Sequence, residues 1–219
     1  MSDTDSSMLK YYAARALEYD RVYDKPERQA DLHALKQWLP ARFLGRQVLE
    51  VACGTGYWTQ VIAPVASKML ALDAAPETLQ IARARVASRK VSFVEGDAYA
   101  LPGGRGPFTA AFAGFWFSHV PVQRRRRFLQ DLGAALEPGA RVVLLDNTFV
   151  DGSSTPIAGS DADGNTYQLR ALDDGSTHRV LKNFPTEAEL LALAAGAGTA
   201  ATYKAFKYYW VLEYSAPAP

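Results

Sequence analysis

Residues 48–59, Val-Leu-Glu-Val-Ala-Cys-Gly-Thr-Gly-Tyr-Trp-Thr, join an apolar segment to a glycine turn. The first five residues are apolar apart from Glu50, which is typical of a strand buried on both faces of a parallel sheet. Gly54 and Gly56 then predict a turn in which no Cβ keeps a ligand away from the backbone. Such a turn suits a nucleoside. Turns that bind dinucleotides carry a third glycine, and Thr59 stands at that position here.

The same residues resemble the first motif of the class I S-adenosylmethionine-dependent methyltransferases. That motif reads Leu-Asp/Glu-Val-Gly-Cys-Gly-Thr-Gly, and the chain departs from it only at Ala52, where the family has its first glycine. A methyl group there asks for slightly more room beneath the amino-acid part of the cofactor. The resemblance implies that S-adenosylmethionine binds here and leaves as S-adenosylhomocysteine, with contacts from Glu50, Ala52, Gly54, Gly56 and Trp58.

Two acidic residues follow the next predicted strands at the intervals found in this family. The resemblance implies that Asp73 accepts hydrogen bonds from both ribose hydroxyls, since a carboxylate offers two acceptor oxygens. It also implies that Ala74 leaves room for the adenine, that Asp97 binds the adenine amino group, and that the amide of Ala98 faces a ring nitrogen. Without the family, Asp73 is compatible with a helix N-cap and Asp97 with an ordinary turn.

Aromatic residues near the N-terminus recur at helical spacing. Tyr12, Arg15, Tyr19 and Tyr23 follow one another at intervals of three and four, which predicts one face of a helix. One interpretation is that these tyrosines cover apolar core. The other comes from the resemblance, because Tyr-rich N-terminal helices cap the site in many small-molecule members. It implies cofactor contacts from Tyr12 and Tyr19, and from Arg15 to the methionine carboxylate.

A second aromatic group follows the fourth predicted strand, at the sheet edge where open α/β folds bind ligands. Phe115, Trp116 and Phe117, together with Tyr12 and Tyr19, predict an apolar pocket whose ring faces attract a sulfonium, or else ordinary core. Phe115 is assigned to the cofactor. His119 is the predicted catalytic base, because an acceptor hydroxyl or ammonium must lose a proton and imidazole titrates near neutrality. The alternative is a packed histidine.

The amino-acid composition limits the classes of protein to which this chain can belong. Of 219 residues, 48% are hydrophobic and 21% charged, which suits one globular domain. The 24 basic and 23 acidic residues nearly balance, so no global field favours nucleic acid or an anionic membrane. A signal peptide and an apolar run of about 20 residues are missing, so a cytoplasmic location is expected. The single cysteine, Cys53, excludes an internal disulfide, and no metal is expected. We expect a monomer or homodimer.

These residues need an α/β fold to bring them together. We expect a Rossmann-like three-layer sandwich with a mostly parallel seven-stranded sheet and an antiparallel last strand. The expected segments are an N-terminal helical cap over 1–40, a cofactor-binding core over 41–147, an insertion or lid over 148–185, and a C-terminal helix with an edge hairpin over 186–219. The insertion is too long for a simple connection. Its candidate substrate contacts are Tyr167, Arg170, His178 and Lys182.

The predicted function is methyl transfer to oxygen or nitrogen of a small-molecule acceptor, since no extra domain or basic surface is present to hold a macromolecule. The arginine run 124–127 does not change this, because successive helical residues step about 100° around the axis and cannot all face one partner. Two alternatives stay open. One is a methyltransferase acting on RNA or protein. The other is a cofactor-binding regulator without turnover, which Thr109 favours because the family carries an acidic residue there.

Overall fold

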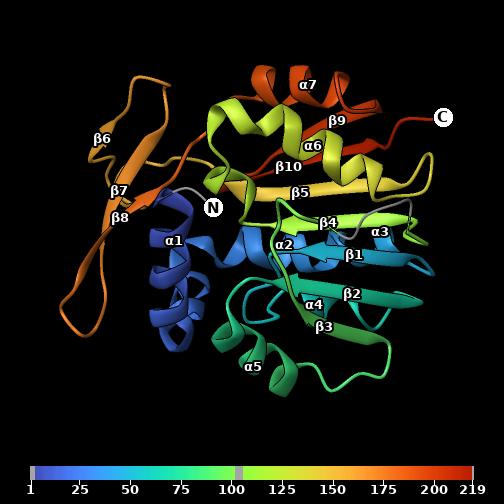
Figure 1. Ribbon diagram of the computed structural model, residues 1–219, viewed down its shortest axis with the longest axis horizontal. Coiled ribbons are helices and arrows are strands. Elements are labelled where there is room, and N and C mark those ends of the chain that lie inside the picture. Colours follow the sequence, from blue (N-terminus) through green and yellow to red (C-terminus); the bar gives the residue numbers. More distant parts are fainter. Residues whose placement is uncertain (1–2, 102–105, 219) are drawn as a thin grey trace.

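A seven-stranded sheet forms the centre of the computed structural model, which describes residues 3–101 and 106–218 (Figure 1). The strand order is β3-β2-β1-β4-β5-β10-β9. Strands β1 to β5 pair in parallel, whereas β10 runs antiparallel to both β5 and β9. The predicted sheet, mostly parallel with a reversed last strand, is confirmed. The bounds are β1 Gln47–Val51, β2 Lys68–Asp73, β3 Val91–Glu95, β4 Ala110–Gly114, β5 Arg141–Asn147, β9 Thr199–Ala205 and β10 Tyr209–Ser215.

Helices cover both faces of this sheet. Val48 of β1 packs in the core that contains Leu35 of α2, whereas its neighbour Leu49 packs in the core that contains Leu132 of α6. Because successive strand residues point to opposite faces, these two cores lie on opposite sides. The three-layer prediction is therefore confirmed. The helices of the core are α2 Gln29–Trp38, α3 Pro40–Phe43, α4 Thr59–Ile62, α5 Pro76–Arg85, α6 Arg125–Ala134 and α7 Glu187–Ala195.

The order of the strands creates the ligand-binding edge. From β1 the chain proceeds outward to β2 and β3, and then crosses back to place β4 on the other side of β1. Open α/β sheets bind ligands at the carboxyl ends of strands where the order reverses in this way. The carboxyl ends of β1 and β2 point toward helix α1 (Asp3–Ala14) (Figure 1).

The N-terminal segment is two helices rather than the single one that the tyrosine spacing predicts. Helix α1 ends at Ala14, and the 3₁₀ helix η1 (Ala16–Tyr23) follows it. The carboxylate of Asp20 in η1 accepts a hydrogen bond from Thr55 Oγ1 at 2.6 Å and pairs with Arg85. These two contacts tie η1 to the glycine turn and to α5, so tertiary contacts set its path.

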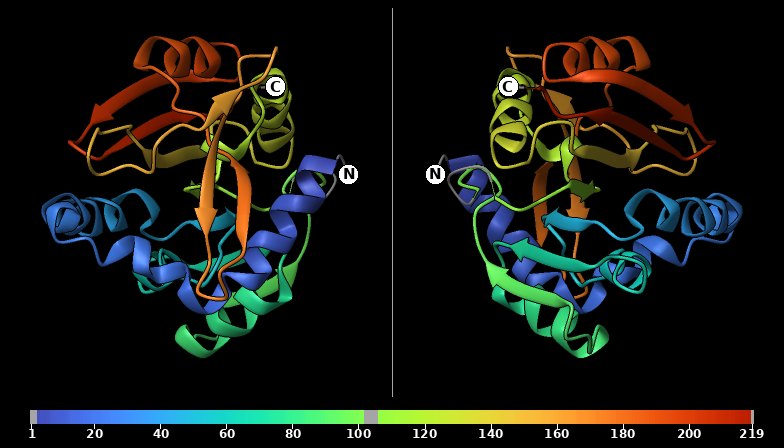
Figure 2. Two further views of the ribbon diagram at one scale, coloured as in Figure 1. Left: turned by 90° about the vertical axis from the view of Figure 1, so that its left-hand side faces the viewer. Right: turned by 90° about the vertical axis from the view of Figure 1, so that its right-hand side faces the viewer.

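The predicted insertion contains a small antiparallel sheet that the sequence did not reveal. Its strands are β6 Gly159–Ser160, β7 Thr166–Ala171 and β8 Thr177–Leu181, in that order. The small sheet packs against α1, where Met8 contacts Tyr167 and Leu181, and Tyr11 contacts Leu172 and Val180. Figure 2 (left) shows β7 and β8 standing before the strand ends beside α1. Together they close the ligand edge from outside.

No helix in residues 3–101 or 106–218 is both long and apolar enough to cross a membrane. Within the same ranges, no three His, Cys, Asp or Glu side chains gather as a metal site would require.

Candidate functional site

A cavity opens at the carboxyl ends of β1 to β4, beneath α1 and η1. Most of the predicted site residues line it: Tyr12, Tyr19, Ala52, Gly54, Asp73, Ala74, Asp97, Ala98, Phe115 and His119. Trp116 of the predicted aromatic pocket and Ala75, the neighbour of Ala74, also line it, and residues that the sequence did not indicate complete the wall: Met8, Leu9, Leu72, Thr78, Gly96 and Tyr99. Of the predicted aromatic cluster, only Phe117 lies elsewhere, fully buried in the core beside α6.

The remaining predicted cofactor residues, Arg15, Glu50, Gly56 and Trp58, do not line this cavity. Glu50 is buried in β1, where it accepts a hydrogen bond from Thr59 Oγ1 at 2.7 Å, and burial raises its pKa to about 8. Gly56 faces α5, since a Cβ there would lie 3.1 Å from Ala82. Trp58 is buried with its ring stacked 6.1 Å from that of Phe115. Glu50, Gly56 and Trp58 therefore contribute to the packing around the turn and not to the wall of the cavity.

The backbone around the cavity is strained at two residues that are not glycine. Ala52 has φ +54° and Phe115 has φ +61°, both in the left-handed region. An L-residue there costs about 1–2 kcal/mol relative to the right-handed form, and glycine avoids that cost. The glycine that the family carries at the position of Ala52 thus has a backbone reason. Such strain is commonly found at ligand sites.

Asp73 sits at the end of β2 with its carboxylate held by the glycine turn. Its Oδ2 accepts from the backbone N–H of Gly54 at 2.8 Å, and its Oδ1 accepts from Ala75 N at 3.0 Å and Thr78 Oγ1 at 2.9 Å. Burial raises the pKa of Asp73, and these three hydrogen bonds oppose that rise. The bonds fix the carboxylate at the cavity mouth, and Oδ2 retains a lone pair for a ligand hydroxyl.

Asp97, after β3, presents a second carboxylate to the same cavity. Its Oδ1 accepts the backbone N–H of Tyr99 at 2.8 Å. No described residue hydrogen-bonds its Oδ2, which leaves that oxygen as an acceptor for a ligand.

His119 and Tyr12 form a hydrogen-bonded pair on the far wall. His119 Nδ1 lies 2.6 Å from the carbonyl oxygen of Leu181, which assigns the ring proton to Nδ1. Nε2 then accepts the Tyr12 hydroxyl proton at 2.8 Å. Burial, followed by the positive charges of Lys182 and Arg170, holds the pKa of His119 well below its usual value. The imidazole is therefore neutral at neutral pH, and its lone pair points at the tyrosine.

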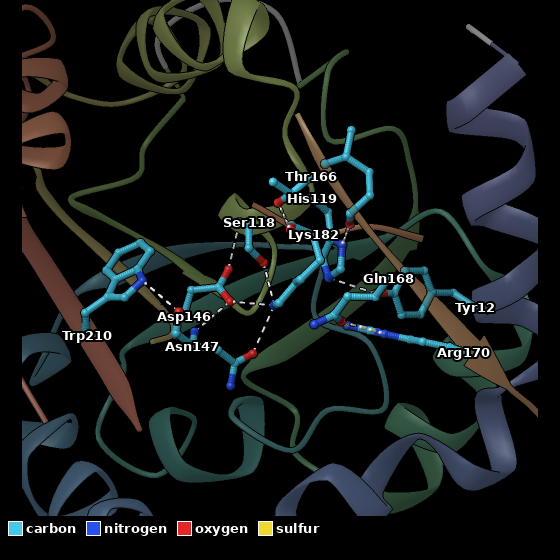
Figure 3. Close-up of polar contacts among 11 residues, drawn as sticks. Tyr12, Ser118, His119, Asp146, Asn147, Thr166, Gln168, Arg170, Lys182 and Trp210 are labelled. Carbon is cyan, nitrogen blue, oxygen red and sulfur yellow. Dashed lines mark hydrogen bonds and ion pairs between the residues drawn. The ribbon is translucent and has the colours of Figure 1, made fainter. Parts of the chain in front are cut away.

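A buried polar network lies directly behind this pair (Figure 3). Lys182 donates to Ser118 Oγ at 2.6 Å, to Asp146 Oδ1 at 2.9 Å and to Asn147 Oδ1 at 2.9 Å. Burial lowers the pKa of Lys182 to about 8, against the opposing charge of Asp146. The sequence offered Lys182 only as one of several substrate contacts. The polar end of β5, Asp146 and Asn147, was the available signal for its partner.

A second cavity lies on the other side of the network. Arg15, Arg170 and Lys182 line it. Of the remaining candidates from the insertion, Tyr167 packs on Met8, and His178 lies with its ring 5.3 Å from that of Tyr11. Neither Tyr167 nor His178 lines either cavity.

The first cavity fits S-adenosylmethionine. Two carboxylates with free acceptor capacity face a ligand with ribose hydroxyls and an adenine amino group. Gly54 leaves space that a side chain would fill, since a Cβ there would lie 3.8 Å from the Tyr19 ring. Alanines 74, 75 and 98 leave flat apolar walls, and the rings of Tyr12, Tyr19 and Phe115 offer faces that attract a sulfonium.

Comparison with known proteins agrees with this geometry. A family model described as a methyltransferase domain matches residues 48–139. The ubiquinone biosynthesis O-methyltransferase of Xanthomonas axonopodis pv. citri is 30% identical over 207 residues, which cover 90% of this chain and 82% of that protein. A demethylmenaquinone methyltransferase of Lactococcus lactis is 31% identical, but the match spans only 48% of this chain and 43% of that protein.

Solved structures extend the similarity over the whole chain. A complex of DhpI with SAH superposes with a TM-score of 0.80 at 30% identity, covering 99% of this chain and 98% of that one. A complex of DhpI with SAM and HEP gives 0.78 at 28% identity, covering 97% and 98%.

Proposed function

Because the chain belongs to the class I S-adenosylmethionine-dependent methyltransferases, we propose that it transfers a methyl group to an oxygen atom of a small-molecule acceptor. The observation that carries this proposal is one cavity that joins the glycine turn and Asp73 to the Tyr12–His119 pair. The similarity to an O-methyltransferase of ubiquinone biosynthesis supports oxygen as the accepting atom.

The residues of the cavity have separate tasks in this proposal. Asp73 and Asp97 hold the ribose and the adenine, and Tyr19 and Phe115 face the sulfonium. When bound, the cofactor supplies an electrophilic methyl group, so the protein has mainly to position the acceptor. Positioning two reactants contributes up to about 7–11 kcal/mol in favourable cases.

Tyr12 and His119 provide a route for the proton of an acceptor hydroxyl. Since the Tyr12 hydroxyl donates to Nε2 and its oxygen also accepts from Arg170, one oxygen lone pair is left to accept a proton from the acceptor. We assign the role of base to His119, acting directly or through Tyr12. We also assign residues 148–185 to the wall of the acceptor site, because β8 supplies the carbonyl that orients His119.

Incubation with methyl-labelled S-adenosylmethionine and a fractionated extract of small metabolites tests the proposal. We expect label in a small-molecule fraction, and less label with the Asp73→Asn variant at a limiting concentration of the cofactor. Label only in RNA or protein would contradict the small-molecule acceptor. Binding of S-adenosylhomocysteine without transfer to any fraction would favour a regulator without turnover.

A further inference from the structure

The side chains that line the second cavity carry an excess of positive charge. Its cationic side chains are Arg15, Arg21, Lys25, Arg28, Arg170 and Lys182, and its single carboxylate is Glu18. The cationic residues come from the start of η1 and η1 itself, the segment after it, β7 and the residue that follows β8. Several segments far apart in sequence therefore converge to place cations around one space.

Only two of these cations are paired with a carboxylate. Lys182 pairs with Asp146, and Arg21 pairs with Asp173 and Glu18. The other four make no ion pair with a described carboxylate. The Arg15 guanidinium lies over the faces of the Tyr11 and Tyr19 rings, 5.7 and 5.4 Å from their centroids.

The rest of the unpaired set binds neutral oxygens. Arg28 and Lys25 donate to Ser153, and Arg170 donates to Gln168 Oε1 at 2.8 and 3.1 Å. Arg28 is 4% exposed. Burial, followed by the charge of Arg28, lowers the pKa of Lys25. One carboxylate lies close by: Glu27 Oε1 accepts from Ser153 Oγ at 2.7 Å, and this hydrogen bond, with the charges of Lys25 and Arg28, lowers the pKa of Glu27, but Glu27 forms no ion pair with either cation.

A buried donor in the same wall also lacks a partner. Asn147 is 8% exposed, and its Oδ1 accepts from Lys182, which fixes the orientation of the amide. Its Nδ2 is buried and has no hydrogen-bond acceptor in the described chain. A buried donor left unpaired costs about 1–3 kcal/mol, so a ligand oxygen at this point would be stabilised.

The side chains that line this cavity contact those that line the first. Arg15 lies over the ring of Tyr19, and Tyr19 lines the first cavity. Tyr11 lines the second cavity and stands 5.0 Å, ring to ring, from Tyr12 of the first. Lys182 lines the second cavity and bonds Ser118, the neighbour of His119. A molecule held in the second cavity therefore lies next to the Tyr12–His119 pair.

We propose that the second cavity binds a phosphate- or phosphonate-type group of the methyl acceptor, seated among Arg15, Lys25, Arg28, Arg170 and the Asn147 amide. The inference rests on the proposed function, whose acceptor it specifies. Four unpaired cations exceed the single charge of a carboxylate, whereas a phosphate-type group carries about −1.5 to −2 at neutral pH. Arginine forks also match its oxygens with paired hydrogen bonds.

Calorimetric titration of methylphosphonate into the protein saturated with S-adenosylhomocysteine tests the site. We expect saturable binding that weakens as salt rises, because charge drives it. Acetate should bind about tenfold more weakly, and the neutral dimethyl ester of methylphosphonate should not bind. Arg15→Gln and Arg170→Gln should each weaken methylphosphonate binding about tenfold. The matched control is Arg127→Gln, which removes an exposed arginine paired with Asp131 and should leave the affinity unchanged.

The outcomes separate the two proposals. Binding of S-adenosylhomocysteine without binding of methylphosphonate would overturn the anion site and leave the methyltransferase proposal standing. Binding of methylphosphonate without S-adenosylhomocysteine would overturn the proposed function. Acetate binding as tight as methylphosphonate, or equal losses in all three arginine variants, would contradict the assignment. Retained S-adenosylhomocysteine binding in Arg170→Gln shows that this variant folds.

If Arg15→Gln lost S-adenosylhomocysteine binding but kept methylphosphonate affinity, Arg15 would belong to the cofactor site and leave the anion set.

Discussion

His119 Nε2 accepts a hydrogen bond from the Tyr12 hydroxyl at 2.8 Å, which joins the segment after β4 to the N-terminal helix. The pKa of each residue is shifted so that its neutral form is favoured. Burial raises the pKa of Tyr12 to about 12, and burial lowers that of His119 well below 6.5. The pair is neutral around pH 7 and keeps its proton on the tyrosine.

The pH dependence of turnover follows from this pair. Because His119 keeps its lone pair down to its lowered pKa, kcat/KM should stay flat through pH 6.5 and fall only at lower pH. His119→Asn should lower kcat about 100-fold or more, the usual range for loss of a general base. The measurement is a pH–rate profile with the acceptor found by labelling. His33→Asn, an exposed histidine on α2, is the control. An acid limb centred at or above 6.5 would contradict the assignment.

Removal of the negative charge of Asp73 should weaken the cofactor site. Asp73→Asn loses charge-assisted hydrogen bonds, each worth about 1.5–3 kcal/mol, so binding of S-adenosylhomocysteine should fall about 10- to 100-fold. Isothermal calorimetry measures it. Glu95→Gln is a matched control, because Glu95 lies beside Asp73 in the register of β2 and β3 but does not line the cavity. Equal losses in both variants would point to a general effect of charge at this edge.

Glu50 should make the stability depend on pH. Its pKa is about 8 in the folded chain against an ordinary 4.5, so the folded state holds a proton that the unfolded state releases between these values. The stability that the protonated Glu50 contributes is fully present below about pH 4.5 and is lost as the pH rises to about 8. The loss is at most about 5 kcal/mol.

Glu50→Gln should therefore gain stability relative to the native chain as pH rises across this window. Urea unfolding at about pH 5 and about pH 8 measures the difference. Glu137→Gln, which alters an exposed carboxylate, should show no such trend. If the gap for Glu50→Gln stayed constant with pH, Glu50 would be ionised in the folded state.

The Lys182–Asp146 pair should be costly to break from one side. Lys182→Met leaves Asp146, which is 0% exposed, as a buried charge without a cation, at a cost of about 3–5 kcal/mol. Adding Asp146→Asn should recover part of that loss, because the remaining side chain is neutral. Chemical denaturation of both variants measures the two values. A double variant less stable than Lys182→Met would show that Asp146 acts independently of the lysine.

The core and the first cavity could be predicted because their signals are local. The apolar strand at Val48, the glycine turn after it and the carboxylate at Asp73 lie within one short stretch, and a parallel sheet brings successive strand ends to one edge. The second cavity had no local signal. Arg15 and Arg170 are 155 positions apart, and they meet there only because the small sheet packs on α1.

Helix periodicity predicted one N-terminal helix where the structure has two, for a similar reason. The spacing of Tyr12, Arg15 and Tyr19 is correct for a single helix, yet Asp20 bonds Thr55 and Arg85 and redirects the chain after Ala14. Arg15 falls at this break and lines the second cavity instead of the first. A partner 35 residues away in sequence cannot be read from a local pattern.

The position of β10 bears on the order in which the chain can fold. Strand β9 is synthesised first, yet in the sheet it pairs only with β10, which sits between it and β5. During translation β9 therefore has no strand to join until residues 209–215 leave the ribosome. The half of the sheet that carries Asp73 can assemble earlier, so the strands that line the first cavity should fold before β9 and β10 complete the opposite edge.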